Sequence, residues 1–111
     1  MRRSESRVAS RARKNMQKLA DLLKEHGIPL TIVVYPWPAL IEAYDPDNRQ
    51  VTLWREFCAK NCKEFINLFP TFHAAKRAHD DWYERLFIFG DFHYSAGGNR
   101  LVFDEMAKHL F

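Results

Sequence analysis

The stretch Ile28-Pro29-Leu30-Thr31-Ile32-Val33-Val34-Tyr35-Pro36-Trp37-Pro38 decides the kind of fold that this chain can adopt. From Leu30 to Tyr35 it is an apolar, β-branched run, which is typical of a strand buried on both faces in a parallel sheet. Pro29 prevents a helix from continuing into this run, and the Pro-rich turn that begins at Pro36 ends it. The stretch therefore predicts a buried strand that opens directly into a turn.

A helix is expected before this strand. From Val8 to His26 apolar residues recur at spacings of three and four, which is the pattern of an amphipathic helix. Gly27 follows as a residue suited to the C-terminal cap. The chain therefore enters the predicted strand from a helix, which is how units of an α/β fold are built.

The same pattern continues toward the C-terminus. We expect a helix over Val51 to Lys63, a second short strand over Glu64 to Phe69, a short helix within the ambiguous segment Thr71 to Glu84, a third strand or an extended connection over Leu86 to Phe89, and a last helix from Gly97 or Gly98 to Leu110. The expected buried face of the last helix is Val102, Met106 and Leu110, joined by Phe103 and Ala107. Alternating helices and strands indicate an α/β fold with a parallel sheet.

Composition fits one folded domain with a basic N-terminal arm. The chain has 111 residues, of which 47% are hydrophobic and 14% aromatic, so there is enough apolar material for a core. No apolar run is long enough to span a membrane, and no signal peptide is visible.

Residues 1–18 carry seven basic residues and one acidic residue. We assign residues 1–10 to the arm and residues 11–111 to the globular part. A basic arm can contact nucleic acid or anionic lipid, but no aromatic residues interleave its arginines, so we expect a solvated arm and no nucleic-acid partner.

The cysteines and most of the histidines do not predict a metal centre. Cys58 and Cys62 are four residues apart in a predicted helix, where side chains converge poorly for a disulfide. We expect two small apolar core residues. A disulfide is the alternative if the helix frays before Cys62, and a metal site is a third. His73 and His79 match no known spacing of metal ligands, so no metal is expected.

The stretch Gly90 to Asn99 holds the residues with the clearest chemistry. Asp91 and His93 lie two residues apart, after an apolar run and before the last helix. A carboxylate so placed can orient an imidazole and stabilise its protonated form, as two members of a serine-hydrolase triad do. The structural alternative is that Asp91 caps the helix and His93 is an ordinary loop histidine. Trp37 would lie on the same side, at the carboxyl ends of the strands, where ligands bind in open α/β sheets; the alternative is that it packs against the surface of a helix.

The pattern Asp-x-His-aromatic-Ser-x-x-Gly, followed by an amphipathic helix, resembles the last conserved block of the SGNH/GDSL hydrolases. It is most similar to the branch that includes alginate O-acetyltransferase-like proteins, and the resemblance covers residues 18–111. It implies a three-layer α/β/α, flavodoxin-like fold with a short parallel sheet. It also implies a serine esterase or O-acyltransferase that acts on small acyl esters or acetylated carbohydrate, without a metal or organic cofactor. In that chemistry His93 is the base, Asp91 orients it, and Trp37 contacts substrate.

The chain departs from that family at the nucleophile. It has no Gly-Asp-Ser block and no Gly-x-Asn-Asp block, and its only serines are Ser4, Ser6, Ser10 and Ser95. We expect Ser95 to cap the last helix. Residues 11–111 therefore resemble the C-terminal portion of such a domain, whose nucleophile comes from another segment or chain. The alternatives are a non-catalytic small α/β interaction module with a basic arm and, more weakly, a metal-dependent hydrolase. The sequence leaves localisation open, although relatives in this family are often exported or membrane-anchored.

Overall fold

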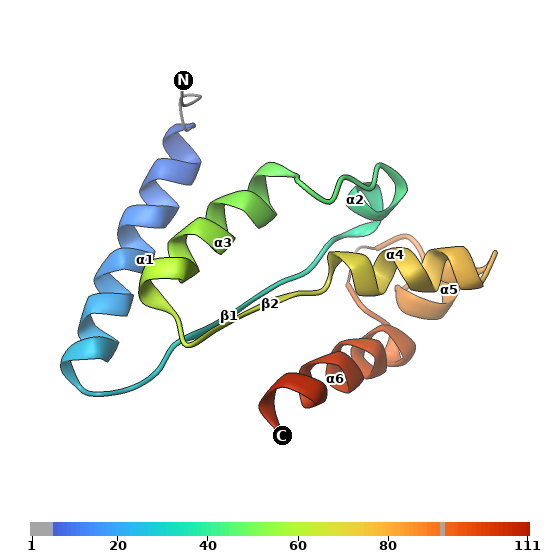
Figure 1. The fold of residues 1–111 in the computed structure, drawn as a ribbon. Helices are drawn as coiled ribbons and strands as arrows, with labels where there is room; N and C mark the ends of the chain where they lie inside the picture. Colours follow the sequence, from blue (N-terminus) through green and yellow to red (C-terminus); the bar gives the residue numbers. More distant parts are fainter. Residues whose placement is uncertain (1–5, 92) are drawn as a thin grey trace. The chain divides into compact units, whose positions relative to one another are not determined.

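The computed structural model describes residues 6–91 and 93–111 and has a mixed α/β fold. It is mostly helical (64%), and a short two-stranded parallel sheet is flanked by helices. The elements are α1 (Arg7–Glu25), β1 (Thr31–Val34), α2 (Pro38–Glu42), α3 (Arg49–Asn61), β2 (Glu64–Asn67), α4 (Phe69–Ala78), α5 (Trp82–Leu86) and α6 (Ala96–Leu110) (Figure 1). The sequence predicted β1, β2, α1, α3 and α6, whereas the short helix α2 was not foreseen.

The chain divides into two compact units, and neither unit is one continuous segment. Unit 1 holds the described residues up to Ile32 together with Leu53–Phe65, and unit 2 holds Val33–Thr52 and Ile66–Phe111. Each strand therefore starts in unit 1 and ends in unit 2. The amide of Lys63 donates to the carbonyl of Leu30 at 2.7 Å within unit 1. Strand pairing thus contributes backbone hydrogen bonds to both units.

In unit 1, caps define both ends of α1. The Ser6 hydroxyl accepts a hydrogen bond from the Ala9 amide at 3.1 Å, which satisfies one of the unpaired amides of the first turn. At the other end Gly27 has a φ of 67°, and the amide of Ile28 donates to the carbonyl of Leu23 at 2.8 Å. This is the Schellman arrangement, which requires the left-handed conformation that glycine adopts without strain. The prediction that Gly27 caps this helix is confirmed, and the helix extends into the residues assigned to the arm.

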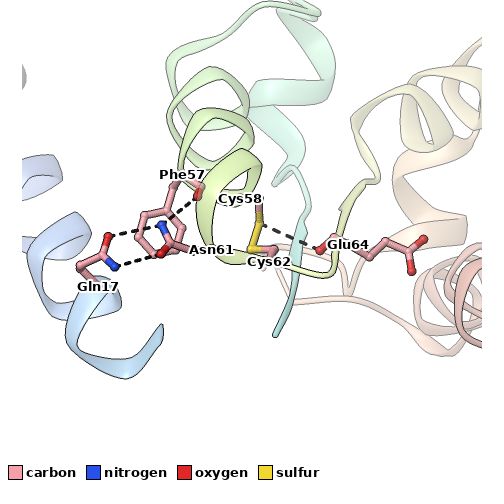
Figure 2. The surroundings of a disulfide bond; sticks show 6 residues. All are labelled: Gln17, Phe57, Cys58, Asn61, Cys62 and Glu64. Carbon is pink, nitrogen blue, oxygen red and sulfur yellow. Dashed lines mark hydrogen bonds between the residues drawn. A yellow bond between two sulfur atoms is a disulfide. The ribbon is translucent and has the colours of Figure 1, made fainter. Parts of the chain in front are cut away.

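A disulfide joins Cys58 and Cys62, and the expectation of two separate core thiols was wrong (Figure 2). The reason is that α3 ends at Asn61, so Cys62 lies just beyond the helix and its Cα approaches that of Cys58 to 4.5 Å. Cys58 is buried, and its sulfur lies 4.0 Å from the carbonyl oxygen of Glu64, the first residue of β2. The disulfide therefore fixes the short connection from helix to strand.

A second contact at the same helix end ties α3 to α1. The side-chain amides of Gln17 and Asn61 exchange two hydrogen bonds, of 2.9 and 3.3 Å, and Asn61 also donates to the carbonyl of Phe57 at 3.0 Å (Figure 2). Asn61 thus connects the last turn of its own helix to α1. These contacts, together with the disulfide, hold the end of α3 in place within unit 1.

Unit 2 is built around a cluster of buried aliphatic and aromatic side chains. Its members are Ile41, Ile66, Leu68, Phe72, Trp82, Leu86 and Phe87. Of the two alternatives for Leu86 to Phe89, a third strand or an extended connection, the described residues show no strand, and Phe87 forms only an isolated antiparallel bridge with Tyr94. The first strand was also expected to be buried on both faces, but of its residues only Val34 is fully buried. The core of unit 2 therefore depends more on α4 and α5 than on the sheet.

Helix α6 approaches α5 closely at its N-terminus, and of the face that the sequence predicted, Val102 packs against the core of unit 2 and is partly buried. Its only fully buried residue is Gly98, whereas Phe103 is 55% exposed and Leu110 is 44% exposed. A Cβ atom at Gly98 would overlap the carbonyl oxygen of Leu86, and one at Gly97 would overlap that of Arg85. The two glycines therefore permit a close contact between backbones that any side chain would block.

We expect the disulfide to stabilise unit 1 measurably. Closing a loop of five residues lowers the entropy of the unfolded chain enough to contribute about 2 kcal/mol. The free energy of unfolding, measured by denaturant titration, should therefore fall by about that amount when dithiothreitol reduces the protein. The double variant Cys58→Ala/Cys62→Ala should show the lower stability with or without reductant. Equal stability of the oxidised and reduced wild-type protein would contradict this expectation.

Gly98→Ala should destabilise the protein by about 1–3 kcal/mol, because the added methyl group would push the start of α6 away from Leu86. Asn99→Ala is the matched control, because this exposed neighbour should change stability by no more than about 0.5 kcal/mol. Chemical denaturation of both variants tests the point. A Gly98→Ala protein as stable as the control would show that the two backbones do not approach closely.

Candidate functional site

The candidate site lies in the loop of unit 2 that connects α5 to α6. Within it, the amide of Asp91 donates to the carbonyl of Ile88 at 2.9 Å, and the amide of Ile88 donates to the carbonyl of His93 at 2.9 Å. Gly90 occupies the third position of this turn with a φ of 75°, as a type II turn requires. The tight turn explains why Asp91 and His93 emerge from the same short piece of backbone.

Asp91 and His93 form a direct pair. Oδ1 of Asp91 lies 2.8 Å from Nδ1 of His93 and also accepts the backbone amide of His93 at 3.3 Å. An ionised carboxylate can only accept, so Nδ1 carries the proton in this bond, and in the neutral ring Nε2 is then the basic nitrogen. The side chains are 75% exposed for His93 and 41% exposed for Asp91. The arrangement holds one imidazole tautomer at the surface of unit 2.

Two tyrosines hold this loop, and the sequence analysis assigned neither of them to the site. The hydroxyl of Tyr83, on α5, donates to the carbonyl of Asp91 at 2.9 Å. The hydroxyl of Tyr94 donates to the carbonyl of Pro36 at 3.0 Å, which connects the loop to the turn after β1. Tyr94 occupies the aromatic position of the Asp-x-His-aromatic pattern, which was a usable signal. No pattern in the sequence marked Tyr83.

The ring of Tyr94 is fixed by its aromatic neighbours. It stacks on Phe72, with ring centroids 5.1 Å apart, and lies 5.2 Å from the centroid of Phe87. Burial raises the pKa of the Tyr94 hydroxyl well above its ordinary value, and the nearby Tyr35 raises this pKa further. The hydroxyl therefore keeps its proton at physiological pH and remains a donor to Pro36. The residue next to His93 is thus anchored in the core of unit 2.

An open cleft of about 610 Å³ lies beside the pair, lined by Trp37, Pro38, Ala39, Tyr83, Gly90 and Asp91. The structure thus brings together Trp37 and Asp91, two of the three predicted site residues, and places the third, His93, on the carboxylate of Asp91. Trp37 is 58% exposed, so much of its indole is accessible to a ligand. The cleft can hold a small molecule next to the imidazole–carboxylate pair.

The serine nearest to His93 in the sequence, Ser95, is engaged in a helix cap. Ser95 accepts the amide of Gly98 at 3.2 Å and donates to the carbonyl of Arg85 at 2.7 Å. The prediction that Ser95 caps the last helix is confirmed. Ser6 and Ser10 belong to α1 and its cap in unit 1, and Ser4 lies outside the described residues. No serine of the described chain is presented as a triad nucleophile by these contacts.

The remaining histidines and cysteines do not gather into a metal site. Among residues 6–91 and 93–111, no group of three or more His, Cys, Asp or Glu side chains is placed to hold a metal ion. His73 stacks on Tyr44 with ring centroids 4.0 Å apart, and its buried Nδ1 has no hydrogen-bond partner in the part of the chain that the structure describes. His73 therefore serves mainly as a packing residue between α4 and the segment after α2.

No family model, curated protein or solved structure matches this chain. In the described part of the chain, no helix is both long enough and apolar enough to cross a membrane.

Tyr83→Phe should loosen the Asp91–His93 pair without disturbing the packing of the ring. The change removes only the hydroxyl that holds the Asp91 carbonyl, so the carboxylate should fix the imidazole less well. In ¹⁵N NMR spectra the His93 ring should shift toward a mixture of the two neutral tautomers. Tyr44→Phe is the control, because that ring stacks on His73 instead. An unchanged tautomer ratio in Tyr83→Phe would show that Tyr83 does not position the pair.

Proposed function

We propose that this chain supplies the histidine and the aspartate of a serine-type acyl-transfer site, and that it belongs to the SGNH/GDSL hydrolases. The observation that carries the proposal is the 2.8 Å contact between Asp91 Oδ1 and His93 Nδ1, at the margin of a cleft that contains Trp37. A carboxylate on Nδ1 leaves Nε2 to exchange protons with a nucleophile. The pair is also rigidly based, because Tyr83 and Tyr94 hold its loop.

The proposed reaction is a two-step acyl transfer. In the first step Nε2 of His93 takes the proton of a serine hydroxyl as the serine oxygen attacks the ester carbonyl. The imidazolium then returns that proton to the departing alkoxide, leaving an acyl-serine. In the second step water or an acceptor hydroxyl attacks this acyl group, with His93 acting again as base. Asp91 stabilises the imidazolium in both steps.

The serine in this proposal comes from outside the sequence, as the resemblance to SGNH/GDSL domains implies. Ser95 cannot serve without giving up the cap of α6, where it makes two hydrogen bonds. The exposure of His93 fits a site that another segment completes. A parallel sheet of two strands is also small for an α/β domain. Added strands would complete the three-layer α/β/α arrangement, with the Gly-Asp-Ser turn facing His93.

The proposed substrates are small acyl esters, including acetyl groups on carbohydrate. Two features of the cleft support this class. Apart from Asp91 and the hydroxyl of Tyr83 its walls are apolar, and the half-exposed indole of Trp37 offers the flat surface on which sugar rings pack. Neither feature requires a metal or an organic cofactor. Transfer to an acceptor and hydrolysis use the same two residues of this chain.

A non-catalytic interaction module is the second candidate, and exposed aromatic surface favours it. Phe89 is 85% exposed and lies in the turn that precedes Asp91, and Trp37 is exposed as well. Exposed apolar residues of this size are common at protein interfaces. In that case Asp91 and His93 would serve only to shape the loop, and their replacement would change binding of a partner rather than catalysis.

Reconstitution separates the two candidates. The isolated chain should show no serine-dependent hydrolysis of p-nitrophenyl acetate, because a nucleophile must lie within about 3 Å of the imidazole. Fusing or co-expressing a Gly-Asp-Ser segment from an SGNH domain should produce esterase activity. His93→Ala should then abolish nearly all of it, and Asp91→Asn should lower kcat by about a thousandfold or more.

His79→Ala is the matched control, because this exposed histidine lies at the end of α4 and outside the cleft. Its activity should equal that of the fused wild-type protein. Hydrolysis by the isolated chain that survives His93→Ala would refute the proposed function. A folded fusion that binds acetyl ester but hydrolyses none would favour the interaction module.

A further inference from the structure

The cleft beside the Asp91–His93 pair is lined by aromatic and small residues together with one carboxylate. Of the described residues that line it, two are aromatic, three are proline, alanine and glycine, and one, Asp91, has a carboxyl group. No lysine, arginine or histidine lines it among residues 6–91 and 93–111. The cleft therefore offers a ligand aromatic surface and negative charge, with few hydrogen-bond donors.

The charge of the surrounding unit has the same sign. In unit 2, residues 33–52 and 66–111, nine aspartates and glutamates exceed six lysines and arginines, which gives a net charge of −3 with histidine neutral. Tyr83 adds no donor toward the cleft, because its hydroxyl proton is engaged by the Asp91 carbonyl at 2.9 Å. Local and unit-wide electrostatics therefore both favour a positively charged ligand over an anionic one.

We propose that this cleft binds an organic ammonium ion in which methyl groups replace most N–H bonds, such as a trimethylammonium group. Such a cation is attracted by the faces of aromatic rings, most strongly by tryptophan, and by a nearby carboxylate. Because a trimethylammonium group has no N–H bonds, it needs no hydrogen-bond acceptors from the protein. Apart from Asp91, the side chains that line the cleft offer few such acceptors. A primary ammonium would lose hydration there without regaining hydrogen bonds.

Trp37 and Asp91 contribute different interactions to the binding of the cation. Trp37, just before the first turn of α2, is 58% exposed and presents its indole to the ligand. Asp91 supplies the charge from the opposite segment of chain, held by the backbone turn at Gly90 and by Tyr83. The inference does not rest on the proposed catalytic role, since it needs only the cleft. If both hold, the ester that reacts at His93 carries a methylated ammonium group.

The test compares choline with 3,3-dimethylbutan-1-ol, which has the same shape but no charge. Binding to the full chain is followed by the NMR shift of the Trp37 indole N–H, assigned by its loss in Trp37→Leu. Choline should bind at least tenfold more tightly than the neutral alcohol. Asp91→Asn should weaken choline binding at least fivefold and leave the alcohol unaffected, and Trp37→Leu should weaken both ligands.

Phe89→Ala is the control variant, because Phe89 is 85% exposed and does not line the cleft. Its affinity for choline should equal that of the wild-type protein. Equal affinities for choline and the neutral alcohol would overturn the proposal, as would the absence of choline binding at tens of millimolar. Choline binding that persists unchanged in both Trp37→Leu and Asp91→Asn would also overturn it, since the cation would then bind elsewhere. Because no ester is cleaved in this assay, failure of the proposed catalytic function leaves these outcomes unaffected.

Discussion

The hydrogen bond from the Tyr94 hydroxyl to the Pro36 carbonyl is the contact on which the arrangement of the site depends. It joins residues 58 positions apart in the sequence, at 3.0 Å. One end belongs to the turn that presents Trp37, and the other follows His93 directly. The tyrosine ring is held by Phe72 and Phe87. The hydrogen bond therefore positions both the turn before Trp37 and the loop that contains His93 relative to these two aromatic rings. Without it, the cleft wall and the imidazole would be set by separate loops.

Local sequence patterns predicted the elements whose causes are themselves local. The Gly27 cap, the Ser95 cap and the strand after Pro29 each depend on a residue acting on its immediate neighbours, and each is found in the structure. The pairing of Asp91 with His93 is also local, because the two residues are only two positions apart in one short loop, which places their side chains within hydrogen-bond distance. A family resemblance pointed to the same two residues.

Sequence reasoning was less successful where the outcome depends on a helix end or on packing between elements. The last helix contacts the core through Val102, as expected, but also through the backbone approach of Gly98 to Leu86, and Phe103 of the expected face remains exposed. The disulfide, which the sequence offered only as an alternative, follows from a helix that ends one residue before Cys62, and helix ends are difficult to place within a residue or two. Tyr83 belongs to the site only because α5 places its hydroxyl within hydrogen-bond distance of the Asp91 carbonyl.

The division of the chain into interleaved units bears on the order in which the protein can be made. The chain passes between the units after Ile32, Thr52 and Phe65. During synthesis from the N-terminus, α1 therefore cannot complete the packing of unit 1 until residues 53–65 have been made. By then residues 33–52 of unit 2 have been made, but the rest of that unit has not. The aromatic cluster forms only when the segment from Ile66 onward is available. Early chains thus expose β1 with no paired strand, which is the stage at which a ribosome-bound holding chaperone would be most useful.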